Sequence, residues 1–291
     1  MSLRLRQLIS REGQSGIIGL SLRFFLLLLF PVAHADEGVM PVVARTHAVI
    51  AIIIDDLGYH PELDRRVVRL PGAVTCAFLP HTPYAPQLAD LADALGKEVM
   101  LHLPMESVEY MNNPGMLNVN MDRQSFARAV RDGLASVPHA SGINNHMGSL
   151  LTQSPLRMQW LMDEIKLHRG IYFVDSYTSV QSVAWQIAAA NRLPSARRDV
   201  FLDNNRDPAM IRAQFERLLA SAWKNGYAIA IAHPYPETVA FLEAKLPALA
   251  GSGIELVPVS RLIERRTTIT AQAVDTGPEE NVALIPASAT H

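Results

Sequence analysis

Cysteine is almost absent from this chain, since Cys76 is the only one among 291 residues. A disulfide within the chain is therefore excluded. Cys76 lies in the apolar segment AVTCAFL, where a free cysteine is more often a small buried residue than a nucleophile. Several signatures are also missing: the GxSxG nucleophile elbow, the phosphate-binding GxxxxGKS, GxxxxGKT and GxGxxG loops, and the HExxH zinc motif. Enzymes and nucleotide-binding proteins built on those local motifs are disfavoured.

Positive charge is sparse and scattered. Lys and Arg total 26 against 28 Asp and Glu, and no basic run follows residue 35. Nucleic acid and anionic membrane surfaces are therefore not expected as partners. The long apolar run of a membrane span is missing too, because residues 24–32 give nine such positions, fewer than a bilayer requires.

The first 35 residues have the pattern of a secretory signal peptide. A start with four arginines precedes the short apolar stretch, and Ala33-His34-Ala35 supplies a small-x-small cleavage site. We expect cleavage after Ala35 and a periplasmic or secreted bacterial protein, with an uncleaved membrane anchor as the alternative. Residues 36–47 are interpreted as a linker, and the Thr/Ala/Pro/Glu-rich residues 266–291 as a disordered tail.

Between residues 48 and 265, strand patterns alternate with helix patterns. Dense Ile, Val and Leu runs such as 51–56 and 227–233 are typical of strands buried on both faces of a parallel sheet. Helix patterns such as 122–135 and 207–224 separate such runs. Seven or eight strand–helix units predict one α/β domain, a barrel or a strongly curved parallel sheet with right-handed crossovers.

Six of the apolar runs end in residues that can bind a metal or carry a proton. The runs are IIIDD, VMLHLP, GINNHMG, YFVDS, VFLDN and AIAIAHP, with Asp55-Asp56, His102, His146, Asp175, Asp203 and His233. Because the carboxyl ends of parallel strands open on one rim, these side chains should meet there although they span about 180 residues of sequence. Their convergence predicts a functional site.

Asp56, His102 and His146 form the two-histidine, one-carboxylate set of many open catalytic metal sites. Two adjacent carboxylates after an apolar strand repel each other, and a nearby cation removes most of that cost. We therefore expect one divalent metal at this set, Zn²⁺ by its histidine content, although Mn, Co or Fe also suit such ligands. Either histidine alone would more often be a core or surface residue, and one carboxylate alone could cap the turn at residues 57–58.

Three other strand ends have two interpretations each. His233 could protonate a leaving group from the opposite side of the rim, or it could be a turn histidine held before a Pro-rich loop. Asp175 and Asp203 could each orient a histidine or cap the following helix. Asp203 precedes Asn204-Asn205 and has the more cap-like setting.

Taken in order, IIIDDLG, LHLPME, NNHMGS, FVDS, FLDN and AIAHPYPET resemble the divergent polysaccharide deacetylases of bacteria, distant relatives of the NodB-type carbohydrate esterases. The resemblance covers roughly residues 48–265. It implies a distorted (β/α) barrel of the NodB type, with one divalent metal at the carboxyl ends of the strands.

The resemblance also implies roles for individual residues. Asp55 matches the position of the family's general base, Asp56 its metal-binding aspartate and His102 its first metal-binding histidine. His233 matches the histidine general acid. His146 has no counterpart in the typical NodB motif, and its NNHMGS setting is similar to a replacement ligand within the divergent group.

Two departures accompany the resemblance. Glu106 stands where typical relatives have the second histidine of an H-x-x-x-H motif, and Asn144-Asn145 stand near the place of an Arg-x-Pro-Tyr segment. The resemblance predicts an exported metal-dependent hydrolase that removes acetyl groups from a glycan or peptidoglycan-like substrate. The long polar stretch 104–121, with Tyr110, could form part of a sugar-binding lip.

Two other functions stay open. One is a non-catalytic glycan- or protein-binding module that retains the metal site, an alternative that the two departures favour. The other is a metal-dependent phosphatase or a different amidase on the same rim, because one kind of metal site serves many reactions.

Overall fold

The computed structural model of the chain describes residues 48–109 and 113–266. The expected signal peptide (1–35), the linker (36–47), Tyr110 and the expected tail from residue 267 onward lie outside the described residues. Within the two described ranges, no helix combines the length and the apolar character that a membrane crossing requires.

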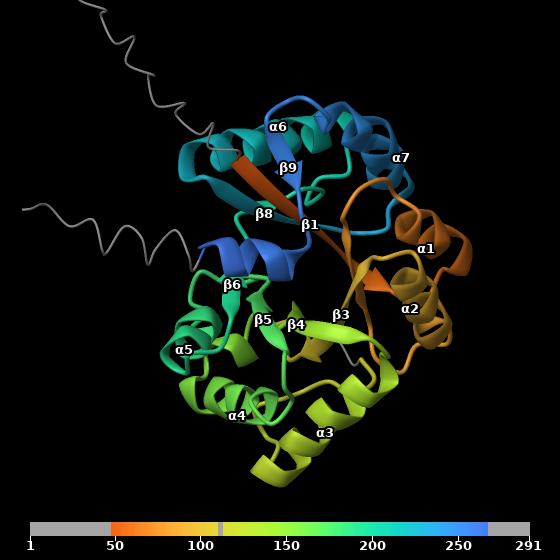
Figure 1. Ribbon diagram of the computed structural model, residues 1–291. Helices are drawn as coiled ribbons and strands as arrows, with labels where there is room; N and C mark the ends of the chain where they lie inside the picture. Colours follow the sequence, from red (N-terminus) through yellow and green to blue (C-terminus); the bar gives the residue numbers. More distant parts are fainter. Residues whose placement is uncertain (1–47, 110–112, 267–291) are drawn as a thin grey trace, which may run out of the picture. The chain divides into compact units, whose positions relative to one another are not determined.

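Strands and helices alternate along the described chain (Figure 1). The strands are β1 (Ala48–Leu57), β2 (Thr75–Phe78), β3 (Glu98–Met105), β4 (Ala140–Met147), β5 (Tyr172–Asp175), β6 (Ser195–Arg197), β7 (Val200–Phe201), β8 (Tyr227–Ala232) and β9 (Ile254–Leu256). The α-helices are α1 (Pro61–Val68), α2 (Ala85–Ala94), α3 (Arg123–Ser136), α4 (Pro155–Ile165), α5 (Ala184–Ala190), α6 (Pro208–Asn225) and α7 (Pro236–Lys245). Two short 3-10 helices, η1 (Leu151–Gln153) and η2 (Leu246–Leu249), and a last helix over 259–266 complete the described elements.

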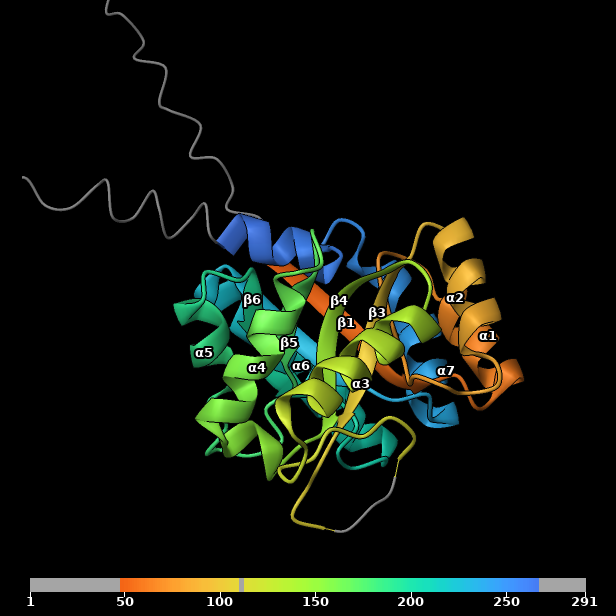
Figure 2. The ribbon, with the colours of Figure 1, turned by 90° about the horizontal axis from the view of Figure 1, so that it is seen from below.

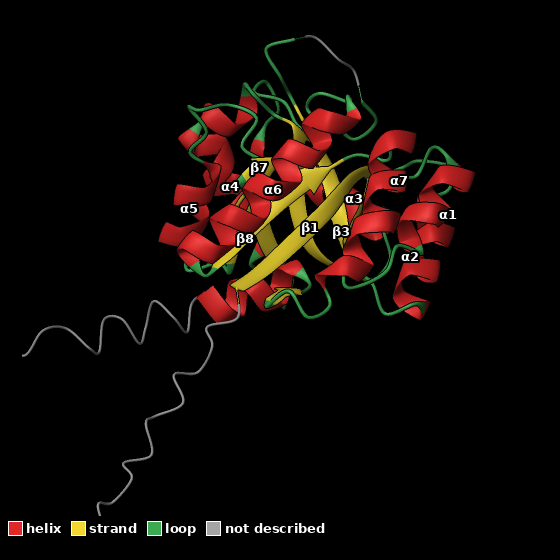
Figure 3. Cartoon of the chain, turned by 90° about the horizontal axis from the view of Figure 1, so that it is seen from above, coloured by secondary structure: helices red, strands yellow, loops and turns green. Residues whose placement is uncertain are grey.

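The strands pair in parallel in the order β6-β5-β4-β3-β2-β1-β8-β7, and β9 pairs with the first residues of β1. β6 and β7 lie at the two edges of this order, yet Arg198 and Asp199 alone separate them in sequence. The sheet must therefore curl until its edges approach each other, and the α-helices pack around its outside (Figures 1 and 3). The predicted fold class, a single α/β domain with a strongly curved parallel sheet, is confirmed.

The unbroken apolar run of β1 is explained by burial on both faces of the strand. Alternate residues serve two different clusters of the core, as strand geometry requires. Ile50, Ile52 and Ile54 join the large cluster between the sheet and the helices, and Val49, Ala51 and Ile53 join the smaller cluster inside the curl. Every second residue along a strand therefore faces the inside of the curl, as Val49, Ala51 and Ile53 do on β1.

The last helix closes the end of the curl where the strands begin. Its residues Val259 and Leu262 belong to the inner cluster. The Glu98 carboxylate at the start of β3 accepts hydrogen bonds from the backbone N–H groups of Val259 (2.9 Å) and Ser260 (3.2 Å), and a carboxylate there caps the helix. The loop that follows β3 projects from the opposite end (Figure 2), which is the rim formed by the carboxyl ends of the strands.

Gly142 on β4 lies where the inside of the curl is filled tightly. A Cβ atom at this position would lie 2.3 Å from Cζ of Tyr172. Because the Tyr172 ring would have to move, we expect Gly142→Ala to lower the free energy of unfolding by about 1–3 kcal/mol, measured by chemical denaturation.

Gly133→Ala on α3 is the control for this substitution. Its Cβ would lie 3.5 Å from the side chains of Leu101 and Leu103, an ordinary contact, and alanine is favoured over glycine inside a helix. This variant should be as stable as the original chain or more stable. Equal stability of the Gly142→Ala variant and the original chain would contradict the packing inside the curl.

Candidate metal centre

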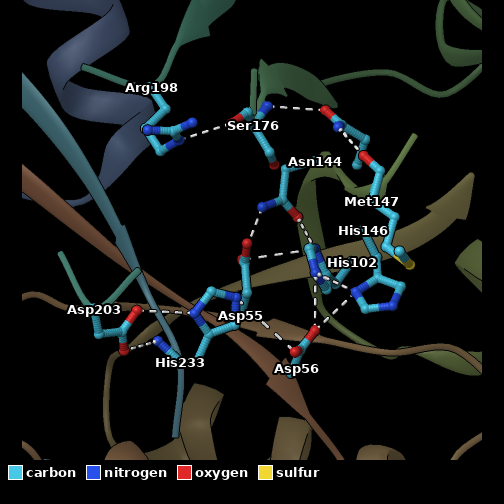
Figure 4. A network of polar contacts seen from close by, with 11 residues as sticks. Asp55, Asp56, His102, Asn144, His146, Met147, Ser176, Arg198, Asp203 and His233 are labelled. Atoms are coloured by element: carbon cyan, nitrogen blue, oxygen red, sulfur yellow. Dashed lines mark hydrogen bonds and ion pairs between the residues drawn. The ribbon is translucent and has the colours of Figure 1, made fainter. Parts of the chain in front are cut away.

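The inward-facing side chains change from apolar to polar as the strands reach the rim. On β1 the inward series passes from Ile53 to Asp55, and on β8 it passes from Ile231 to His233. The same spacing of two residues on the neighbouring strands extends this layer. Its members are Asp55, His102, Asn144, Ser176, Arg198 and His233 (Figure 4). The predicted convergence of distant strand ends at one rim is thus observed.

Asp56 faces the same space as Asp55 because β1 is irregular at this point. The pairing register with β2 shifts between Ile54 and Leu57, and Asp56 has φ 60, the left-handed form that non-glycine residues avoid. Met147 has the same form directly after His146, with φ 55. Strained backbone of this kind persists where the surrounding structure enforces it, often at functional sites.

One oxygen of Asp56 lies between two imidazoles. Its Oδ1 is 3.1 Å from Nε2 of His102 and 2.9 Å from Nδ1 of His146, and the two nitrogens are 3.1 Å apart (Figure 4). Tetrahedral ligands bound to zinc at 2.0–2.1 Å lie about 3.3 Å from one another. The triangle of Asp56, His102 and His146, which we call the metal triad, therefore has the size that one small divalent cation requires.

The hydrogen bonds and charges around the metal triad also suit a cation. Nδ1 of His102 lies 2.8 Å from Oδ1 of Asn144; with the amide oriented in this way, Nδ1 donates to Asn144, and Nε2 is the nitrogen that faces Asp56. Burial alone would raise the pKa of Asp56, but His102 and His146 lower it, so this carboxylate stays ionised. Burial alone would lower the pKa of His102, but the Asp55 and Asp56 carboxylates raise it, so a proton or a metal cation is favoured between Nε2 and Asp56.

Asn144 connects the metal triad to Asp55. Its amide nitrogen donates to Oδ1 of Asp55 (2.8 Å) while its amide oxygen accepts from His102, and both Asn144 and Asp55 are buried. Burial raises the pKa of Asp55, although His102, His233 and Asn144 partly oppose that rise. The sequence analysis treated Asn144 as a departure from the Arg-x-Pro-Tyr pattern and missed this role; its inward spacing on β4 is the signal that could have revealed it.

Asp203 orients His233, so the cap-like interpretation of Asp203 was wrong. Its Oδ1 lies 2.9 Å from Nδ1 of His233, and its Oδ2 accepts hydrogen bonds from the His233 backbone N–H (2.7 Å) and the Thr238 hydroxyl (2.9 Å). The reason is that β7 pairs with β8 and carries Asp203 to the end of β8, whereas Asp207 caps α6. Asp175 instead holds the turn that leads to α5, accepting from Ser182 and from backbone N–H groups.

His233 points its free nitrogen into the site. Nε2 lies 3.9 Å from Oδ2 of Asp56. Burial alone would lower the pKa of His233, but the hydrogen-bonded Asp203 carboxylate, with Asp55 and Asp56, raises it to about 9. The imidazole therefore holds a proton at neutral pH, next to the metal triad.

Glu106, at the position of the missing second histidine, lies outside the metal triad. Its Oε2 accepts a hydrogen bond from the backbone N–H of Val119 (2.7 Å), and its carbonyl oxygen accepts from the N–H groups of Leu150 and Leu151. The side chain thus holds the two ends of the loop after β3 together, a structural role that the sequence pattern does not reveal.

Two cavities meet at the metal triad, and both are lined by Asp56 and His146. One, of about 470 Å³, extends toward Tyr59 and Tyr235. The other, of about 340 Å³, extends over the polar layer to Arg198. An extended ligand could therefore cross the metal triad from one side to the other.

Residues 52–263 match the family model described as divergent polysaccharide deacetylase. The chain belongs to this family. Among curated proteins it is similar to the uncharacterized protein YibQ of Escherichia coli, with 37% identity over 215 residues that cover 74% of this chain and 67% of the relative. It is also similar to an uncharacterized protein of Haemophilus influenzae, with 36% identity over 214 residues that cover 73% of this chain and 76% of the relative.

The likeness extends to a solved structure. The crystal structure of an uncharacterized Agrobacterium tumefaciens protein matches with 27% identity and a TM-score of 0.71, covering 74% of this chain and 89% of that one. The resemblance to the divergent polysaccharide deacetylases and the barrel of their type are therefore confirmed.

The metal triad predicts the effect of removing one ligand. We expect His146→Ala to abolish stoichiometric Zn²⁺ binding at neutral pH, because only two of its three protein ligands remain. Metal per chain is measured by plasma mass spectrometry after loading and desalting. Glu106→Gln is the control and should bind as much metal as the original chain. Undiminished metal in His146→Ala would show that the ion is held elsewhere.

Asp203→Asn should lower the pKa of His233 from about 9 toward its ordinary 6.5, because the variant loses the hydrogen-bonded negative charge. In the original chain, protonated His233 stabilises the fold fully below pH 6.5, and this contribution is lost as the pH rises through about 9. The variant should lose less stability over that interval. An NMR titration of His233 checks the shift, and Asp175→Asn serves as control; an unchanged midpoint in Asp203→Asn would contradict the assignment.

Proposed function

We propose that this protein is an exported bacterial hydrolase that uses one divalent metal ion to remove acetyl groups from a glycan. The observation that carries the proposal is the placement of Asp55 and His233 in one polar layer beside the metal triad. Membership of the divergent polysaccharide deacetylase family supports the reaction class. The basic and apolar pattern of the first 35 residues supports export to the periplasm or beyond.

Zn²⁺ is the proposed metal, because two imidazoles and one carboxylate with open positions are typical of catalytic zinc. Held by Asp56, His102 and His146, such an ion would supply Lewis acidity toward a water molecule and the acetyl carbonyl. The buried Asn144 lies between the proposed metal ligand His102 and Asp55. Its amide oxygen binds His102, and its amide nitrogen binds Asp55.

Asp55 is the proposed general base. Its Oδ1 is occupied by the Asn144 amide, which leaves Oδ2 to take a proton from the attacking water. Burial raises the pKa of Asp55 above its ordinary value, and a base with a raised pKa holds the proton better once it has been transferred. The hydrogen bond from Asn144 fixes the direction of the carboxylate.

His233 is the proposed general acid. Asp203 holds Nδ1, so the proton on Nε2 is the one directed into the site. With a pKa of about 9, His233 enters the reaction protonated and can deliver that proton to the departing amine or alkoxide. Asp55 then accepts a proton, and His233 donates one, at the same acetyl group.

The cavity on the Tyr59 side is the proposed place for neighbouring sugar units. Tyr59, Leu63 and Tyr235 present ring and aliphatic surface beside Asp56, and Arg206 lies over the Tyr235 ring with its guanidinium carbon 4.4 Å from the ring centre. Amphipathic walls with a few polar groups are typical of ligand sites. Asn113, from the loop after β3, also lines this cavity, which supports the predicted sugar-binding lip.

A non-catalytic glycan-binding module is the second candidate. The observation in its favour is Glu106, which stands where typical relatives carry a second histidine and is directed to Val119 instead of the metal triad. Under this alternative the metal triad holds an ion and the cavities hold a glycan, but no bond is broken.

Acetate release separates the two candidates. The full mature chain, loaded with Zn²⁺, should release acetate from acetylated chito-oligosaccharides or peptidoglycan fragments, and chelation should stop the reaction. Asp55→Asn should reduce the rate by about 10²–10⁴-fold while metal content stays unchanged. Binding of several acetylated glycans without any acetate release by the loaded chain would establish the binding module instead.

A further inference from the structure

Arg198 occupies the seam where the two edges of the curled sheet approach each other. It is one of the two residues between β6 and β7. Its backbone N–H donates to the carbonyl oxygen of Asp175 on β5, and the next residue, Asp199, donates to Ile229 on β8. Its side chain continues the inward series of β6 after Ala196, so it reaches the polar layer from the side opposite the metal triad (Figure 4).

Two backbone carbonyls hold the guanidinium in place. Nε donates to the carbonyl oxygen of Ser176 (2.7 Å), and Nη2 donates to that of Tyr177 (2.9 Å). The guanidinium carbon lies 5.0 Å from the centre of the Phe201 ring. Nη1 has no hydrogen-bond partner among the residues that the structure describes, and Arg198 lines the cavity of about 340 Å³ that leads to the metal triad. The free edge of a fixed guanidinium is thus directed to a ligand space.

The carboxylates around Arg198 are each engaged by other donors. Asp175 accepts from the Ser182 hydroxyl and from backbone N–H groups, Asp199 accepts from the Ile229 backbone N–H (2.8 Å), and Asp55 accepts from Asn144. Within the described ranges, Arg198 forms no ion pair with any of them. Fixing a half-buried cation without a carboxylate in contact is unfavourable, so this charge is suited to an anion that arrives with a ligand.

We propose that Arg198 binds a carboxylate of the substrate, so that the acetylated glycan carries an acidic group close to the acetyl group that is removed. A guanidinium presents parallel N–H donors that match the two oxygens of a carboxylate. The same cavity is lined by Asp55, Asp56 and Glu109, which repel a doubly charged phosphate more strongly than a singly charged carboxylate. The identity of the acidic substrate rests on the proposed function, whereas binding of the acidic glycan can be tested without turnover.

The test compares matched oligosaccharides with the full mature chain. The ligands are a neutral acetylated chito-oligosaccharide and two acetylated oligosaccharides of equal length, one with a lactyl ether carboxylate and one with a uronic acid unit. Calorimetry with Zn²⁺-loaded protein gives the affinities. We expect at least one acidic ligand to bind about 10–100-fold more tightly than the neutral one, as a charge-assisted pair provides, and the acidic ligand preferred shows which carboxylate position fits.

Substitution of Arg198 decides whether it causes that preference. Arg198→Gln should reduce the ratio of acidic to neutral affinity to within about threefold of one, whereas Arg198→Lys should keep part of it, because the charge remains without the planar fork. Arg197→Gln is the matched control, since that guanidinium lies 4.3 Å from the centre of the Tyr177 ring and should leave the ratio unchanged. Melting temperature and metal content establish that each variant is folded and loaded.

The outcomes separate this inference from the proposed function. An Arg198-dependent preference for acidic ligands without acetate release would keep the subsite and reject the hydrolase. Acetate release at equal efficiency from neutral and acidic glycans would keep the hydrolase and reject the subsite. A preference that survives in Arg198→Gln, or one that appears for a phosphorylated glycan and not for either carboxylate, would also overturn the subsite.

Discussion

Two imidazole nitrogens approach a single carboxylate oxygen, Oδ1 of Asp56, within about 3 Å. This contact is possible because three parallel strands end at one level and because β1 turns Asp56 inward with a left-handed backbone. Such a contact is favourable where a proton or a metal cation lies between the nitrogen and the carboxylate oxygen. The other polar residues of the rim are arranged around it: Asn144 fixes the His102 ring through Nδ1, and Asp203 fixes the His233 ring through Nδ1.

Two neighbouring carboxyl groups of the rim have opposite pKa shifts. Asp55 and Asp56 are adjacent in sequence, yet burial raises the pKa of one while two histidines lower that of the other. The pKa of His233 is raised mainly by a third carboxylate, that of Asp203. This edge of the sheet therefore offers an ionised carboxylate, a buried carboxyl group of raised pKa and a protonated imidazole at neutral pH, the groups that the proposed metal-assisted hydrolysis would use.

Much of this arrangement could be predicted from the sequence because it follows from strand periodicity. Apolar runs that are buried on both faces give a parallel α/β sheet, and polar residues at their carboxyl ends must then share a rim. Asp56, His102 and His146 could be selected in advance for this reason, and the structure brings them together. Asn144 could have been included by the same argument, because it lies two residues before His146 on the same strand and its side chain therefore points to the same face.

Other features depend on pairings that no local pattern encodes. The role of Asp203 depends on β7 lying beside β8, and its Asn-rich neighbourhood suggested a cap instead. Glu106 occupies a motif position but bonds to Val119, thirteen residues further along the chain. Arg198 was missed altogether, because the short strand β6 was not recognised in the sequence, and because β6 and β7 approach each other only when the whole sheet curls.

Anomalous diffraction from crystals of the mature chain grown with Zn²⁺, recorded on both sides of the zinc absorption edge, tests the central claim most directly. The account predicts one strong peak per chain, bonded at about 2.0–2.2 Å to an oxygen of Asp56 and to the facing nitrogens of His102 and His146. A chain with no peak at the rim, or with zinc bound at other residues while these three side chains keep their contacts, would contradict it.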